Sequence, residues 1–508
     1  MHRSLFADRG HAGHSWRWLA LPALLTLGAC LAGDAPLSDE PEATSTAAQD
    51  IFKTSAFGWS RDPNGITTTI PICWDERDYP HGPAEPARSA FKEFVRRAVE
   101  ETWQRETGIV FAGWPSHFAA WGDCHTSGFG TPGILLHMSL ESRGLTNVLH
   151  PLDPHADVNL PANGGLTDYL RYTSIHELGH ALGLNHEQAR ADNNGRCNQA
   201  DSWDWAVGLV PGSTVETPFD DRSVMNYCAP NPTGLSPLDI LGIQRLYGHK
   251  PQTNLVSTRG TCVNPVGSAV ALGACQPGTV QGITPYGDNL RLHFASGTAY
   301  AAAPASGGIG PLMASATANP SWDRYQLTNV SLRGLGGKKL NVAFASTAPG
   351  AAVQTWEDGS VGWASNVGSN EQWSFLPDLT IRGIGGQCLD VQWGNPASGT
   401  PVWMWTCNGG PAQQWKIAAD GQIQSVLGAT PMCLEADRDE TDVTTPLAQA
   451  QPVRIASCNG SLRQKWIARG AVTTSDLFGC ITAGGVDGSA VSQAACDGSA
   501  AQIIDVHW

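Results

Sequence analysis

The second half of the chain repeats a unit of about forty residues. The clearest copy is residues 386–415, which begins Gly-Gln-Cys-Leu and closes with Gln-Gln-Trp. Two copies follow it and three weaker copies precede it, so that six units form two sets of three. The repeat therefore predicts two consecutive all-β domains, at residues 254–376 and 379–508, each built from three units.

Pairs of cysteines lie within these units. The chain has thirteen cysteines, and twelve remain when Cys30 is set aside, an even number suited to disulfides in an oxidising compartment. Each pair closes a short loop, which can stabilise a fold by about 3 kcal/mol. The expected pairs are Cys262 with Cys275, Cys388 with Cys407, Cys433 with Cys458, and Cys480 with Cys496.

The register of Gln-x-Trp motifs with paired cysteines resembles the ricin B-type lectins, a family of threefold β-trefoils. The resemblance implies sugar sites that use an acid after the Cys-aliphatic pair, an aromatic residue before the second cysteine, and an Asn before Gln-x-Trp. Residues 386–415 keep Asp390 and Trp405, but Ala412 replaces the Asn. The unit without cysteines offers Asn341, Trp356 and Asn370.

Other trefoil residues are expected to be structural. Glu435 lacks its aromatic partner, and the last unit has Thr482 in place of the acid. The repeated Gln-x-Trp residues, such as Gln413, Trp415, Gln464 and Trp466, match the threefold packing and are expected in the core. Two interpretations of the trefoils remain: they bind glycans weakly, or they are purely structural.

Residues 176–187 read HELGHALGLNHE and carry the chemistry of the first half. His176 and His180 are four residues apart, so a helix places them on one face, where they can grip one tetrahedral ion. Gly183 lets the chain leave the helix and return His186 as a third ligand. Glu177 is placed to take a proton from a water molecule whose pKa Zn²⁺ lowers towards about 7.

The extended His-Glu-x-x-His-x-x-Gly-x-x-His pattern resembles the metzincin zinc proteases. The segment SVMNY offers Met225 for the methionine turn that lies beneath the metal in that family. Glu187, directly after the third histidine, resembles the astacin branch. That resemblance implies that Tyr227 is a further zinc ligand that swings away to stabilise the oxyanion, and that Glu187 engages the mature N-terminus.

A catalytic α/β (α+β) domain is expected over residues 61–249, with a helix near residues 87–107 and the strand GILLHMSL at either an edge or an inner position of the sheet. His137 and His155 are interpreted as ordinary polar histidines. The four cysteines of this domain permit three pairings. We expect the one that joins Cys73 with Cys124 and Cys197 with Cys228.

Residues 1–30 have the shape of a secretory signal, with Arg3, Arg9 and Arg17 before an apolar run that is too short to span a bilayer. The run ends Leu-Gly-Ala-Cys, which resembles a bacterial lipobox and implies cleavage before Cys30 and lipidation of its thiol. An ordinary signal peptide stays open. Residues 31–60 are expected to be a disordered tether or pro-segment.

A net charge of −15 disfavours nucleic acid as a partner. The expected protein is an extracytoplasmic zinc endopeptidase, either secreted or a lipoprotein of a bacterial outer membrane or cell surface, that meets a membrane only through a lipid anchor. Its partners would be protein or peptide substrates and glycans or polysaccharides bound by the lectin-like domains. The alternative is a carbohydrate-binding surface adhesin with an inactive protease domain.

Overall fold

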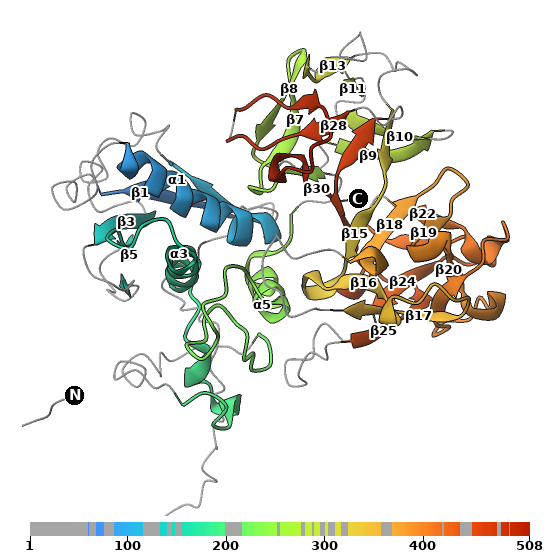
Figure 1. Ribbon diagram of the computed structural model, residues 1–508, viewed down its shortest axis with the longest axis horizontal. Helices are drawn as coiled ribbons and strands as arrows, with labels where there is room; N and C mark the ends of the chain where they lie inside the picture. The colour runs from blue at the N-terminus through green and yellow to red at the C-terminus, as the bar shows by residue number, and fades with distance from the viewer. Residues whose placement is uncertain are drawn as a thin grey trace, which may run out of the picture. The chain divides into compact units, whose positions relative to one another are not determined.

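The computed structural model describes most of the chain from residue 59 onward (Figure 1). The described residues are 59, 68–75, 86–114, 133–139, 145–147, 155–198, 216–250, 254–275, 280–286, 289–294, 300–302, 310–315, 324–356, 368–418, 421–436, 450–474, 479–486 and 488–507. The predicted signal segment with Cys30, and the tether except for Trp59, lie outside them. None of the helices in the described ranges is long and apolar enough to cross a membrane.

The first half contains a five-stranded mixed sheet with the strand order β2-β1-β3-β5-β4. β1, β2, β3 and β5 run parallel, and β4 joins the edge antiparallel to β5. The strands are β1 (Thr68–Trp74), β2 (Ile109–Ala112), β3 (Gly133–Ser139), β4 (Leu145–Asn147) and β5 (His155–Pro161). The segment GILLHMSL therefore forms an inner strand, and the second of the two expected positions is the observed one.

Three α-helices lie among the described residues of the first half. They are α1 (Ala87–Val99), which continues as a π-helical turn (Glu100–Gln104), α3 (Asp168–Ala181) and α5 (Pro237–Tyr247). Trp103, at the end of the first, is fully buried, and its indole N–H donates to the Ile175 carbonyl of α3 at 2.9 Å. The helix that carries the histidines is thus fixed through its backbone to the core.

Residues 330–470 form one complete β-trefoil. Six of its strands pair in a closed ring through β15–β18, β18–β19, β22–β23 and β26–β15 and through single bridges between Thr380 and Gln414 and between Gln422 and Lys465. The other six form three hairpins that meet one another. Its strands are β15 (Val330–Arg333), β16 (Lys339–Val342), β17 (Ala351–Trp356), β18 (Gln372–Phe375), β19 (Ile381–Arg382), β20 (Cys388–Val391), β21 (Val402–Trp405), β22 (Trp415–Ile417), β23 (Ile423–Ser425), β24 (Met432–Ala436), β25 (Ala450–Ser457) and β26 (Ile467–Gly470).

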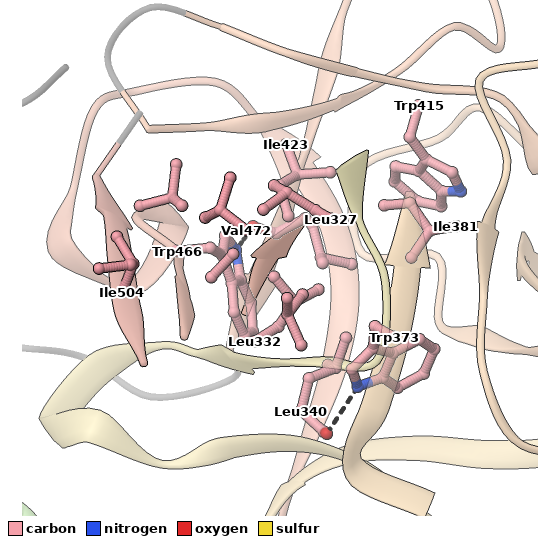
Figure 2. Close-up of a cluster of buried hydrophobic side chains, with 14 of the residues drawn as sticks. Leu327, Leu332, Leu340, Trp373, Ile381, Trp415, Ile423, Trp466, Val472 and Ile504 are labelled. Atoms are coloured by element: carbon pink, nitrogen blue, oxygen red, sulfur yellow. Dashed lines mark hydrogen bonds between the residues drawn. The ribbon is translucent and has the colours of Figure 1, made fainter. Parts of the chain in front are cut away.

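One tryptophan closes each unit of this trefoil in the same way. Trp373, Trp415 and Trp466 are almost fully buried. Each indole N–H donates at 2.9 Å to a carbonyl in the first hairpin strand of its unit, at Leu340, Leu389 and Leu434. Figure 2 shows the cluster of buried side chains and the bond from Trp373 to Leu340. The expectation that the Gln-x-Trp tryptophans belong to the core is confirmed by their burial.

The second trefoil is discontinuous in sequence. β14 pairs with β27, β30 pairs with β6, and β12 pairs with β29, so residues 472–507 supply the third unit to residues 254–327. In Figure 1 the red strands β28 and β30 accordingly lie beside the yellow-green strands β7 and β8. The strands are β6 (Asn254–Val256), β7 (Cys262–Val266), β8 (Ala269–Gly273), β9 (Val280–Tyr286), β10 (Asn289–Phe294), β11 (Tyr300–Ala302), β12 (Gly310–Pro311), β13 (Met313–Ser315), β14 (Arg324–Leu327), β27 (Val472–Thr474), β28 (Cys480–Thr482), β29 (Ser492–Ala494) and β30 (Ile504–His507).

This pairing differs from the predicted division into residues 254–376 and 379–508. The repeat count gives six units, but any three similar units can close around one axis, and the sequence does not say which three do so. In the structure the continuous trefoil is inserted between the second and third units of the other. The register partners Leu327 and Val472 mark the point of insertion.

Five disulfides lie among the described residues. They join Cys197 with Cys228, Cys262 with Cys275, Cys388 with Cys407, Cys433 with Cys458, and Cys480 with Cys496, which confirms those expected pairs. Cys73 is also disulfide-bonded, and its expected partner Cys124 lies outside the described residues.

A buried ionic cluster joins the first half to the discontinuous trefoil. The Arg105 guanidinium donates two hydrogen bonds to the Asp505 carboxylate, at 2.8 and 2.6 Å, and Arg469 donates two more to the same group. Burial alone would raise the pKa of Asp505, but the two guanidinium groups outweigh it and hold that pKa well below its usual range. Removal of one partner would leave a buried charge unpaired.

The strand pairing predicts the outcome of excising the inserted trefoil. Because Leu327 and Val472 are neighbours on antiparallel strands, a short Asn-Gly turn in place of residues 328–471 should leave a trefoil that still closes. Circular dichroism should show cooperative unfolding, and non-reducing mass analysis should show the Cys262–Cys275 and Cys480–Cys496 disulfides.

The control is deletion of residues 379–508, which removes β27 to β30 together with β19 to β26 of the continuous trefoil. Residues 254–327 should then lose cooperative unfolding and become sensitive to protease. A stable fold after this deletion, with none after the excision of 328–471, would contradict the observed pairing.

Candidate functional site

Helix α3 brings His176 and His180 onto one face and fixes both rings through backbone carbonyls. The helix begins at the Thr167 hydroxyl, which accepts a hydrogen bond from the Leu170 amide at 3.3 Å. His176 Nδ1 donates to the Val224 carbonyl and His180 Nδ1 donates to the Leu184 carbonyl, each at 2.7 Å. These bonds set the tautomer of both rings, so each Nε2 carries a lone pair.

The chain turns after α3 and brings His186 back against the same face. Gly183 has a φ of +92°, the left-handed region in which glycine is unstrained. The Tyr247 hydroxyl donates to the Leu182 carbonyl at 2.6 Å and fixes the end of the helix. The Nε2 atom of His186 then lies 3.0 Å from that of His180 and 3.3 Å from that of His176.

This donor set fits a tetrahedral metal ion. Zn–N bonds of 2.0–2.1 Å in tetrahedral geometry place two ligand nitrogens about 3.3 Å apart, close to the distances observed. The three histidines are the group among the described residues whose donor atoms converge in this way. Burial and the two neighbouring imidazoles lower the pKa of His180 well below its usual value, which keeps it in the neutral form that binds metals.

Tyr227 and Glu177 lie next to the histidines. The Tyr227 ring lies tilted against His186 with centroids 4.3 Å apart and stacks on His176 at 5.6 Å. Its backbone N–H donates to the Gln188 side chain at 3.1 Å, which positions the residue at the site. Glu177 follows His176 on the helix and is 7% exposed. Both predicted catalytic residues are therefore near the predicted ligands.

Met225 forms the floor of the site. It is 2% exposed and belongs to a tight turn in which the Asn226 amide donates to the Ser223 carbonyl at 3.0 Å. A Cβ atom built on Gly179 would lie only 2.5 Å from Met225 Sδ. The methionine thus packs against bare helix backbone, and the glycine within HELGH is required by this close approach.

Glu187 is buried beside the same turn. Its carboxylate accepts a hydrogen bond from the Asp220 amide at 2.6 Å and lies 3.5 Å from the Arg190 guanidinium. Burial raises its pKa well above the usual value. A cavity of about 20 Å³ lies between Glu187, Asp220 and Asp239, enough for one water molecule. The segment expected to supply the N-terminal amine is outside the described residues, so that role stays a prediction.

Several positioning groups were not predicted from the sequence. The Ser223 hydroxyl and the Val224 amide donate to the Asp239 carboxylate at 2.6 and 2.9 Å and tie the methionine turn to α5. The Trp59 indole donates to the Ala181 carbonyl at 3.0 Å. The serine of SVMNY could have indicated the hydrogen bond to Asp239. The contact of Trp59 could not have been predicted, because its acceptor is a backbone carbonyl, which every residue has.

His137 contacts two carboxylates and does not belong to the cluster of three histidines. Its Nε2 lies 3.1 Å from Asp157 and its Nδ1 lies 3.7 Å from Asp75. These contacts agree with the interpretation of His137 as a polar histidine. His155 lies in β5, and its side chain is outside the described part of the structure.

In the second unit of the continuous trefoil, Asp390 and Trp405 lie on paired strands. The Trp403 indole donates to Asp390 Oδ1 at 2.8 Å, and Trp405 stacks on Trp403 with centroids 4.7 Å apart. Asp390 is 5% exposed, and its burial raises its pKa. The structure thus brings the two predicted sugar-binding residues, Asp390 and Trp405, close together. Trp403 contacts both of them, through a hydrogen bond to Asp390 and by stacking on Trp405.

The first unit uses its polar residues internally. Asn341 donates to Glu371 at 3.2 Å and accepts from Gln354 at 3.3 Å. Lys339 Nζ lies 3.0 Å from the Glu371 carboxylate, a buried ion pair in the unit that has no cysteines. Asn370 donates to the Val342 carbonyl, and Trp356 is half-buried.

The third unit neutralises its acid. Glu435 lies 3.2 Å from both Arg454 and Arg463, and the Gln464 amide donates to it at 2.8 Å. Gln464 and Gln413 are fully buried, and each clamps the loop before it through backbone bonds. Their expected structural role is therefore confirmed by their contacts.

The contact between Met225 and α3 predicts the effect of a single methyl group. Gly179→Ala should lower the free energy of unfolding by about 1 to 3 kcal/mol, because the added Cβ overlaps the thioether and the site cannot close without a shift. Denaturant unfolding measures this. Gly164→Ala is the matched control, since a Cβ there meets nothing within 4 Å. Equal losses for both variants would refute the packing argument.

Comparison with known proteins identifies the continuous trefoil. The ricin-type β-trefoil lectin domain matches residues 328–466, and no curated protein matches the chain. Similar solved structures include an agglutinin from Abrus precatorius (16% identity, 37% of this chain and 82% of that chain, TM-score 0.24). An earthworm R-type lectin C-half in complex with GalNAc has 16% identity over 28% of this chain and 97% of that chain, with a TM-score of 0.22.

A protease is also among the similar solved structures. High choriolytic enzyme 1, a hatching enzyme zinc-protease from the medaka Oryzias latipes, has 21% identity over 40% of this chain and 100% of that chain, with a TM-score of 0.28. The sequence match and the complete threefold strand pairing lead to the same conclusion for the continuous trefoil. Residues 328–466 form a ricin-type β-trefoil lectin domain.

Proposed function

We propose that the chain is an astacin-like metzincin, a zinc-dependent endopeptidase that carries glycan-binding trefoils. The observation that supports this most is the convergence of three histidine Nε2 atoms beside Glu177 and Tyr227, above the buried Met225. The same cluster would serve no packing purpose, because three imidazole nitrogens 3.0 and 3.3 Å apart repel one another without an ion between them.

Each residue of the site has a separate task in peptide hydrolysis. Zn²⁺ held by His176, His180 and His186 would act as a Lewis acid that polarises water and the scissile carbonyl. Glu177 accepts the proton of the attacking water and passes it to the leaving amine. The Tyr227 hydroxyl donates a hydrogen bond to the oxygen that becomes negative in the transition state. Tyr227 stands beside two ligand rings, which is where an additional ligand or an oxyanion donor is needed.

The lectin domain gives the enzyme a second partner. Lectins of this type bind glycans, and Asp390 with its tryptophans is the best-equipped unit of the three described above. We expect the trefoils to hold the enzyme near glycosylated or polysaccharide-bearing material. The disulfides are compatible with an extracellular location, and the signal segment with lipidation at Cys30 remains part of the proposal.

Replacement of the proposed base separates catalysis from metal binding. Glu177→Gln should lower kcat/KM for casein hydrolysis by about 10²- to 10⁴-fold, because no other group accepts the water proton. Zinc content, measured by elemental analysis, should stay at one per chain. Asp168→Asn, an exposed carboxylate in the first turn of the same helix, is the control and should keep full activity. If zinc binds but the wild type equals Glu177→Gln in rate, the chain is an adhesin with an inactive protease domain.

Replacement of Tyr227 tests the oxyanion role. Tyr227→Phe keeps the ring that contacts His176 and His186 and removes only the hydroxyl. We expect kcat to fall by about 10²- to 10³-fold with little change in KM, because the bond forms in the transition state. Unchanged kcat would assign Tyr227 to packing alone.

A further inference from the structure

Trp393 is an exposed aromatic residue in a backbone conformation that disfavours it. It is 78% exposed and has a φ of +59°. Phe344, at the same position of the preceding unit, has a φ of +56° and is fully exposed. The turn therefore requires the left-handed region in both units, and a glycine would adopt it without strain. An indole held there without burial serves neither the turn nor the core.

Trp393 is supported from behind by two other tryptophans. Its ring meets Trp403 edge to face at 4.7 Å and lies 6.3 Å from Trp405. Phe344 has no such support, because no aromatic ring of the described residues packs on it. Among the described residues of the continuous trefoil, the second unit thus presents a supported aromatic surface to solvent, which indicates a binding site rather than a scattered apolar residue.

A polar hollow adjoins this surface. It has a volume of about 320 Å³, within the range of about 300 to 1,000 Å³ that small-ligand sites show. Gln392, Asn395 and Ser398 contribute to its lining together with Trp393. In the described part of the chain, the side chains of Gln392 and Ser398 make no hydrogen bond. A flat apolar ring beside open hydrogen-bonding groups suits a sugar, whose C–H face stacks on an indole while its hydroxyls bond at the edge.

The neighbouring Asp390 is less available to a sugar than this hollow. Its carboxylate is 5% exposed and already accepts a hydrogen bond from Trp403. We propose that Trp393 and the adjoining hollow are the principal glycan-binding surface of this domain, and that the ligand is an internal stretch of a β-linked polysaccharide. The hollow is open to solvent, so a chain can continue beyond it, and equatorial hydroxyls give β-linked glucose, xylose or N-acetylglucosamine units the flat face that stacking requires. This inference rests on the proposed glycan binding.

The test uses the full-length chain and titration calorimetry with hexasaccharides of β-1,4-linked glucose, xylose and N-acetylglucosamine, and with lactose. At least one hexasaccharide should bind more tightly than lactose. Trp393→Gly should weaken that binding by at least about tenfold, since it removes the stacked ring. The variant should be at least as heat-stable as the wild type, because glycine suits the turn. Trp393→Tyr should restore most of the affinity.

Phe344→Gly is the matched control, because it makes the same backbone change in the preceding unit. Its affinity should stay within about twofold of the wild type. The inference is overturned if Trp393→Gly binds normally, if lactose is the tighter ligand and is lost in Asp390→Asn, or if Trp393 mediates binding to phosphatidylcholine vesicles and to none of the glycans. If the wild type binds no sugar at all, the proposed glycan function itself is wrong, and peptide hydrolysis is unaffected.

Discussion

The hydrogen bond from His176 Nδ1 to the Val224 carbonyl connects the two segments from which the candidate metal centre is built. It orients a candidate ligand of α3 through the backbone of a turn 48 residues further along the chain. The same turn buries Met225 against Gly179 and delivers Tyr227 to the histidines. Asp239 of α5 fixes the turn in its place. One backbone carbonyl therefore couples the ligand geometry to the packing of the floor.

The trefoils use the same device for a different purpose. In each unit of the continuous trefoil, a buried indole donates to a backbone carbonyl of a strand early in that unit. Such a bond contributes about 1 kcal/mol net, but its loss inside a core would leave a polar group without a partner and cost more. The tryptophan therefore fixes where each unit ends, and the units can diverge elsewhere. The first unit accordingly keeps the fold with no cysteines and has a buried ion pair between Lys339 and Glu371.

The sequence predicted most of what depends on local spacing. The three histidines and the disulfides within units follow from residue spacing, because helix geometry and short loops determine which groups can meet. The role of Met225 was expected only from the resemblance to the metzincins. The association of the units could not be predicted, since six similar repeats satisfy the same local rules in more than one grouping. The groups that orient the histidines, the carbonyls of Val224 and Leu184, could not be predicted either. Every residue has a backbone carbonyl, and only the fold determines which of them accepts the hydrogen bond.

Trp393 shows how a functional surface can be separated from the part of the molecule that specifies the fold. The core needs Gln413 and Trp415, which are buried, and the turn at residue 393 needs only a residue that tolerates a positive φ. An indole there costs about 1 to 2 kcal/mol relative to glycine. No core contact of the indole offsets this cost, because the ring is exposed and packs on Trp403 and Trp405 at the surface. Stability alone would favour glycine at this position, so the tryptophan is best explained by what it contacts outside the chain.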